Sequence, residues 1–91
     1  PVDPGMQPDD IERLIKTGFE DATVKVMSDD NTHYGAIVIA AEFEGMRPIA
    51  RHQLVYKTLG TLVGNEIHAL SIQAFTPEEW QARGGPDSQA P

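Results

Sequence analysis

The sequence predicts a single α+β domain with its elements in the order α-β-β-α-β-α, built on a three-stranded sheet. A chain of 91 residues has the length of one domain. Apolar residues recur at helical spacing in some segments, and at alternate positions or in β-branched runs in others. Proline and glycine separate these segments from one another. The simplest packing of such elements places helices on one face of the sheet.

The first helix is predicted to begin at Pro8 and to end near Gly18. Proline is tolerated in a first helical turn, and the carboxylates of Asp9 and Asp10 are stabilising at a helix N-terminus. Glycine is a common residue just beyond a helix end. The apolar residues at helical spacing are Ile11, Leu14 and Ile15.

An antiparallel hairpin is predicted to follow this helix. Residues 22–28 alternate between apolar and polar side chains, as a half-buried strand does. Residues 29–31 form a polar, turn-rich cluster. A second strand, rich in β-branched residues, is predicted from Tyr34 to Phe43. Two strands joined by so short a loop are typical of a hairpin.

The second helix is predicted from Pro48 to Gly64. Placing its residues at steps of 100° gathers the apolar side chains and one histidine in a single arc: His52, Val55, Tyr56, Leu59, Leu62 and Val63. Arg47, Arg51 and Thr58 are expected beside that arc, toward solvent.

A third strand is predicted over residues 67–75, and a short helix follows it. Thr76 as N-cap, Pro77 at the first helical position and Glu79 at the third form a capping box. Gly84 and Gly85 close this helix.

The two ends of the chain are expected to lie outside the domain. Residues 1–5 precede Met6 and are interpreted as a remnant of expression. Residues 85–91 are small, polar and proline-bearing, so we expect a disordered tail. The domain itself is assigned to residues 6–84.

Composition excludes several classes of function. Without cysteine the chain has neither a disulfide framework nor a thiolate metal site of its own. No apolar run has membrane-spanning length, and we expect a cytoplasmic protein without membrane contact. No nucleophile–base pair and no phosphate-binding glycine motif stands out, so we expect that the protein is not an enzyme.

The charge distribution is uneven. The net charge of −7 opposes binding to nucleic acid. Between Glu44 and Glu66, however, there is no acidic residue, and Arg47, Arg51 and Lys57 all lie there. Arg47 and Arg51 are one helical turn apart and are expected to project together. They form either a solvated face or a patch that contacts an anion or a partner.

Three histidines are candidates for metal binding or for acid–base chemistry near neutral pH. His33 ends the hairpin loop, where it is either a solvated side chain or a ligand. His68 opens the third strand and is either a strand-end residue above a core face or a ligand. His52 lies in the apolar arc of the second helix, where a partly buried core residue is the better interpretation.

Four separated blocks of the sequence resemble the BolA family, most closely its bacterial IbaG (YrbA) branch. They are FEGM at 43–46, RHQLVY at 51–56, IHALSI at 67–72 and TPEEW at 76–80. Their order and spacing match, and the resemblance extends from Met6 to about Arg83. It implies a BolA-like fold similar to class II KH domains.

The resemblance also implies a partner and a cofactor. Such proteins bind a monothiol glutaredoxin and share a [2Fe-2S] cluster with it, in iron–sulfur cluster assembly, trafficking, or iron, redox and stress sensing. The glutaredoxin supplies its cysteine and a glutathione thiolate. The ligand histidine of the family corresponds to His68, and its second ligand, from the loop between the first two strands, to His33. Imidazole is an established cluster ligand in Rieske centres.

Partner contacts are expected on the basic second helix, at Arg47, Arg51, His52 and Lys57. The rival hypothesis is a transcriptional regulator that binds nucleic acid through this helix, since family members are also discussed in that role. KH-like folds clamp single strands with a Gly-x-x-Gly loop, and this chain has no such tetrapeptide between two helices. Alone, the protein is expected to be a monomer or a weak homodimer.

Overall fold

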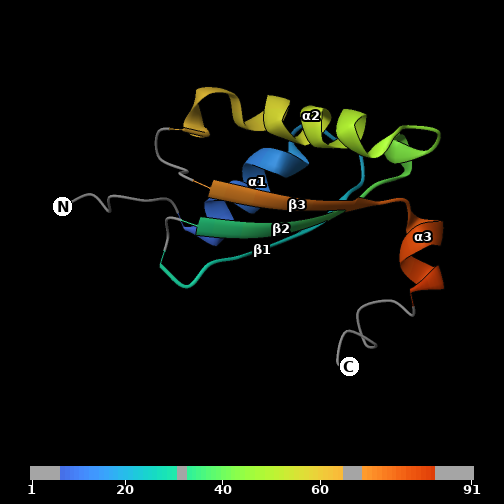
Figure 1. Ribbon diagram of the computed structural model, residues 1–91, viewed down its shortest axis with the longest axis horizontal. Helices are drawn as coiled ribbons and strands as arrows, with labels where there is room; N and C mark the ends of the chain where they lie inside the picture. The colour runs from blue at the N-terminus through green and yellow to red at the C-terminus, as the bar shows by residue number, and fades with distance from the viewer. Residues whose placement is uncertain (1–6, 31–32, 65–68, 84–91) are drawn as a thin grey trace.

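The computed structural model describes residues 7–30, 33–64 and 69–83 (Figure 1). Its elements confirm the predicted order α-β-β-α-β-α and add two short 3-10 turns. In chain order they are α1 (Pro8–Lys16), β1 (Thr23–Met27), β2 (His33–Ile39), η1 (Ala41–Phe43), α2 (Pro48–Leu59), η2 (Gly60–Leu62), β3 (Ala69–Phe75) and α3 (Pro77–Ala82).

The three strands form one mixed sheet in the order β1-β2-β3. β1 and β2 are antiparallel, with Thr23 opposite Ile39 and Met27 opposite Gly35, which confirms the predicted hairpin. β3 runs parallel to β2, and its register pairs His33 with Ala69. The parallel pairing requires a crossover, which α2 provides. The first residues of β2 and β3 therefore lie at the same end of the sheet.

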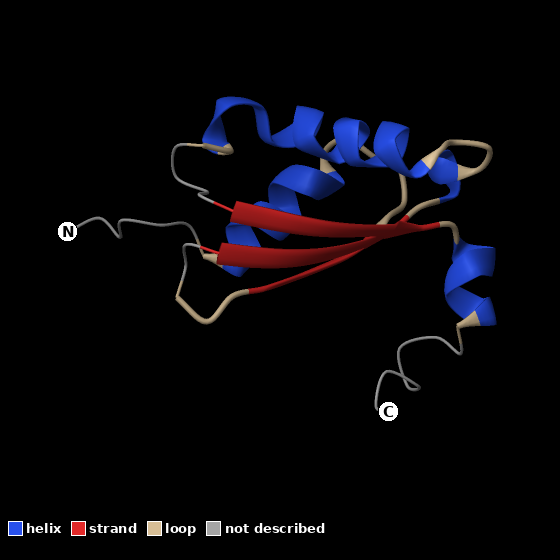
Figure 2. Cartoon of the chain, viewed as in Figure 1, coloured by secondary structure: helices blue, strands red, loops and turns tan. Residues whose placement is uncertain are grey.

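Helices α1 and α2 lie on the same face of the sheet, as Figures 1 and 2 show. Along β1 and β2 every second side chain is buried beneath them, while the side chains between remain partly or fully exposed. The hydrophobic core fills this interface. Its buried side chains are Ile11, Ile15, Phe19, Val24, Val26, Tyr34, Ala36, Val38, Ala40, Phe43, Val55, Leu59 and Ile72.

The predicted second strand was too long at its C-terminal end. β2 ends at Ile39, and a 3-10 turn over residues 41–43 follows it. This turn places Phe43 fully in the core, where its ring meets Phe19 edge-on at 5.3 Å between centroids. A continued strand would alternate its side chains across the sheet, whereas the turn directs Phe43 under the helices.

Helix α2 also ends earlier than predicted, at Leu59 rather than near Gly64. Gly60 has a φ of 58°, a backbone conformation that interrupts a right-handed helix and that glycine adopts most easily. The short 3-10 turn η2 follows. Helix α1 likewise ends at Lys16, two residues before the predicted stop. The first two residues of the predicted third strand, 67 and 68, lie outside the described residues.

The predicted capping box of α3 is confirmed. The Thr76 hydroxyl accepts from the Glu79 backbone N–H at 3.1 Å, and the Glu79 carboxylate accepts from the Thr76 N–H at 2.9 Å. α3 extends from the end of β3, away from α1 and α2 (Figure 1). Trp80 is buried there beside Phe75, with 5.3 Å between ring centroids.

The buried face of α2 is rotated from the predicted arc. Its buried residues are Arg51, Val55 and Leu59, which recur every fourth position. Tyr56, expected in the apolar arc, remains 37% exposed, and His52 is half-buried. The prediction counted hydrophobic side chains and so excluded an arginine from the buried face.

Two side chains of α2 reach over to backbone carbonyls of β3. The hydroxyl of Tyr56 donates to the Leu70 carbonyl at 3.1 Å, and the Arg51 guanidinium donates to the Ala74 carbonyl, also at 3.1 Å. No helix in the described ranges is both long and apolar enough to cross a bilayer.

Candidate functional site

His33 begins β2 with its side chain in solvent. The imidazole is 69% exposed, which agrees with the expected outward placement. Its register partner across the parallel pair is Ala69, the first described residue of β3. His68, the other expected ligand, is joined to Ala69 by a peptide bond but lies outside the described residues.

Two residues of the hairpin, Ser28 and Asp30, contact the backbone of His33, and Asp30 also contacts its ring. Asp30 Oδ1 accepts from the His33 backbone N–H at 3.0 Å, and Asp30 Oδ2 lies 3.0 Å from the ring Nδ1. The Ser28 hydroxyl donates to the His33 carbonyl at 2.7 Å. Asp30 was not predicted as a partner of His33, although an aspartate in a tight turn commonly accepts a hydrogen bond from the backbone a few residues later.

This arrangement suits a metal ligand. A ligating histidine commonly donates its other ring N–H to a carboxylate, which fixes the ring and leaves the second nitrogen for the metal. Asp30 is placed to accept in this way from Nδ1, so Nε2 would be the ligating atom. Among the described residues no group of three or more His, Asp and Glu side chains is gathered as a metal site. Within that part of the chain, the structure therefore offers the exposed His33 imidazole as a single candidate ligand.

The expectation that Arg51 projects into solvent beside Arg47 was wrong. Arg51 is 9% exposed and forms two hydrogen bonds with the Glu79 carboxylate, at 2.7 and 3.1 Å. Its guanidinium also donates to the carbonyls of Met46 and Ala74. It lies 5.7 Å from the ring centroid of Phe43. The charge of Arg51 is thus neutralised from another element.

Electrostatics around this ion pair follow from its contacts. The Arg51 guanidinium, with the Thr76 backbone N–H, lowers the pKa of Glu79 to about 2. A hydrogen bond and charge repulsion from Glu78 raise the pKa of Glu44 above its ordinary value. The pKa values of these two carboxylates near Arg51 are therefore shifted in opposite directions.

The remaining expected contacts do not form one patch with Arg51. Arg47 is the exposed N-cap of α2, and Lys57 is exposed in its last turn. Lys57 comes ten positions after Arg47, about 15 Å along the helix axis. His52 lies between them, half-buried.

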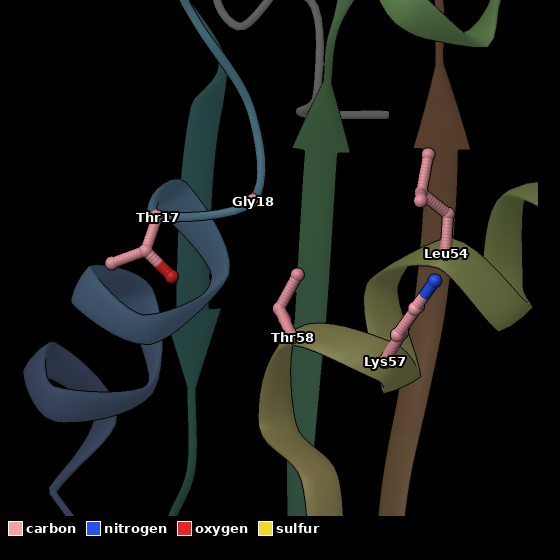
Figure 3. A pocket seen from close by; sticks show the side chains of 5 residues that line it. All are labelled: Thr17, Gly18, Leu54, Lys57 and Thr58. Carbon is pink, nitrogen blue, oxygen red and sulfur yellow. The ribbon is translucent and has the colours of Figure 1, made fainter.

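Lys57 lines a pocket of about 320 Å³ between α2 and the end of α1 (Figure 3). Its other lining residues are Thr17, Gly18, Leu54 and Thr58. In Figure 3, Thr58 on α2 faces the segment that carries Thr17 and Gly18. A Cβ on Gly18 would overlap the Cγ2 methyl of Thr58. Glycine is therefore required for the close approach of the two helices.

Comparison with known proteins identifies relatives over most of the chain. Residues 14–79 match the family model described as BolA-like protein. The chain is 33% identical over 92 residues to the DNA-binding transcriptional regulator BolA of Vibrio cholerae, covering 91% of this chain and 87% of that protein. It is 40% identical over 60 residues to human BolA-like protein 1, covering 66% of this chain but only 44% of the human protein.

A solved structure gives the same result for the fold. The bolA protein homologue from Coxiella burnetii superimposes with a TM-score of 0.71 at 37% identity. The match covers 84% of this chain and 97% of that one. The mixed three-stranded sheet and its helices are therefore the architecture of that structure also.

Proposed function

Since the chain belongs to the BolA-like family, we propose that it is a non-enzymatic adaptor that binds a monothiol glutaredoxin and shares a [2Fe-2S] cluster with it. The observation that carries this proposal is the exposed imidazole of His33, at the sheet end where β3 also begins. His68 directly precedes the register partner of His33 in the chain. The family resemblance assigns the two cluster ligands to these two positions.

Within the complex each protein has a distinct part. The partner supplies a cysteine and a glutathione thiolate, and this chain supplies imidazole nitrogens. Replacing thiolate by neutral imidazole reduces the negative charge of a cluster and raises its reduction potential. A chain without cysteine is suited to this role, because it contributes no competing thiolate. A cytoplasmic setting, where glutathione is reduced, is part of this proposal.

The test is to mix the protein with a monothiol glutaredoxin, iron, sulfide and glutathione. Visible absorbance and circular dichroism bands that require both proteins are the expected result. His68→Ala should weaken the shared cluster. His33→Ala should change its spectrum without abolishing association with the apo-glutaredoxin. His52→Ala is the control for the loss of an imidazole elsewhere. It is measured with glutaredoxin at saturating concentration, because His52 is itself an expected partner contact.

Two outcomes would overturn the proposal. One is the absence of any band that requires this protein in the mixture. The other is a set of spectra and cluster lifetimes that are the same for the parent, His33→Ala and His68→Ala. Circular dichroism in the far ultraviolet confirms that each variant is folded before the comparison is made.

A second candidate function is nucleic-acid binding, favoured by the name of the Vibrio cholerae relative, a DNA-binding transcriptional regulator. The structure leaves Arg47 and Lys57 exposed for phosphate contacts but engages Arg51 with Glu79. With a net charge of −7, we expect no sequence-specific DNA binding at physiological salt. A tight, sequence-selective complex in a mobility assay would reverse this ranking.

A further inference from the structure

One carboxylate contacts His33 at two points. Asp30 Oδ1 accepts the backbone N–H of His33, and Asp30 Oδ2 lies 3.0 Å from Nδ1 of its ring. The two contacts use the two oxygens of the same group, so the position of the carboxylate is tied to the backbone on which the ring stands. The ring and the start of β2 are therefore oriented together.

We propose that Asp30 is a positioning residue that keeps the His33 imidazole in its Nδ1–H form and presents Nε2 to a metal. An ionised carboxylate only accepts hydrogen bonds, so the ring must donate from Nδ1. A neutral imidazole carries one N–H, and Nε2 then keeps its lone pair. The identification of that metal with cluster iron rests on the proposed function, whereas the tautomer of the ring does not.

The substitution Asp30→Asn separates positioning from turn structure. Asparagine keeps one oxygen that can accept from the His33 backbone N–H. Its amide NH₂ replaces the second oxygen and donates to Nδ1, which must then act as an acceptor. The ring proton moves to Nε2, the atom needed for ligation. The Ser28 hydroxyl, which donates to the His33 carbonyl at 2.7 Å, still closes the hairpin end.

Asp29 provides a matched control. It is exposed in the same turn and carries the same charge, and it is one residue further from His33. Asp29→Asn therefore changes the local charge by the same amount as Asp30→Asn. A difference between the two variants reports the specific contact of Asp30 with the ring.

The first measurement uses the isolated protein without metal. Nitrogen-15 NMR of the His33 ring, in buffer alkaline enough to keep it neutral, distinguishes the two tautomers. We expect mainly Nδ1–H in the parent and in Asp29→Asn, and a several-fold shift toward Nε2–H in Asp30→Asn. A parent ring that is mainly Nε2–H, or one that Asp30→Asn leaves unchanged, would overturn the inference. Backbone amide spectra establish that the variants are folded.

The second measurement uses the glutaredoxin mixture. Asp30→Asn should shorten the cluster lifetime and alter its spectrum in the direction of His33→Ala, while Asp29→Asn should match the parent. Cluster properties of Asp30→Asn equal to those of the parent would contradict the positioning role. A parent that forms no shared cluster would refute the proposed function while leaving the NMR result to decide the tautomer.

Discussion

Arg51 and Glu79, 28 residues apart in the chain, form a two-point ion pair that connects α2 to the start of α3. Glu79 also accepts a hydrogen bond from the Thr76 backbone N–H. The same carboxylate therefore completes the capping box and binds the guanidinium. Arg51 further donates to the Ala74 carbonyl at the end of β3. Three elements are thus joined through one pair of side chains.

Replacement of Arg51 by alanine should destabilise the fold strongly. It removes the partner of Glu79 and leaves the carbonyls of Met46 and Ala74 without their donor. We expect a loss of roughly 2–4 kcal/mol in the free energy of unfolding. The loss is smaller than for a fully buried pair because the Glu79 side chain is partly exposed. Urea unfolding measures it, with the exposed Arg47→Ala as control, expected within about 0.5 kcal/mol of the parent. Equal effects of the two substitutions would contradict the internal role of Arg51.

Glu79 should make the stability depend on pH in the acid range. Its pKa falls from an ordinary 4.5 to about 2 in the folded state, so its contribution is complete above pH 4.5 and is lost as pH falls toward 2. The difference in unfolding free energy between the parent and Glu79→Gln should therefore shrink over that interval. Chemical denaturation across this pH series measures the difference.

The pH dependence of stability expected from Glu44 has the opposite sign to that of Glu79. Because Glu78 raises the pKa of Glu44 in the folded state, its charged form is unfavourable there, and its stabilising contribution is lost as pH rises through the raised pKa. Glu44→Gln should leave stability at neutral pH unchanged or increased. A loss like that of Glu79→Gln would show that repulsion from Glu78 is not the dominant effect.

Gly18→Ala should destabilise the contact between α1 and α2. The added Cβ overlaps the Thr58 methyl, and overpacking of this kind costs about 1–3 kcal/mol. Thr58→Ser removes that methyl and keeps the hydroxyl that donates to the Val55 carbonyl. The double variant should recover most of the loss in thermal or urea unfolding.

Gly35→Ala is the matched control for this prediction. A Cβ at Gly35 meets nothing within 4 Å, and the residue lies in a strand. We expect little change or a small gain in stability. If Thr58→Ser failed to rescue Gly18→Ala, the cost at Gly18 would have to come from the backbone rather than from the helix contact.

Charge reversal on α2 tests the partner contacts expected at Arg47 and Lys57. Arg47→Glu with Lys57→Glu should weaken association with glutaredoxin without altering the fold, since both side chains are exposed. Raising the salt should weaken the parent complex also, because exposed charges are screened over about 8 Å at physiological ionic strength. Calorimetry of the two proteins measures both effects. Lys25→Glu on β1 is the control, and an equal loss there would indicate a nonspecific effect of net charge.

Most of the fold was predictable because its signals are local. The capping box at Thr76, the hairpin cluster at 29–31 and the proline at the start of α2 each act within a few residues. The errors fell where tertiary packing overrides a local pattern. Phe43 leaves the strand pattern because the core requires its ring beside Phe19.

The site was predictable only in part, and Arg51 shows why. Its partner Glu79 is far away in sequence and was already explained by its capping role. A buried arginine is recognised only when the opposing carboxylate is seen in space. His33 was correctly expected to face solvent, whereas its link to Asp30 required the turn geometry. The assignments of His33 and His68 as ligands stay predictions.

The hydrogen bonds from α2 to β3 affect whether another molecule can pair with the edge of the sheet. β3 is an edge strand, and because the Phe75 carbonyl faces β2, those of Leu70, Ile72 and Ala74 face outward. Tyr56 and Arg51 already occupy the Leu70 and Ala74 carbonyls. An extended segment from another chain would have to displace both donors to continue the sheet. Helix α2 thus opposes the addition of a strand at the β3 edge, which is one of the two edges through which this open sheet could aggregate.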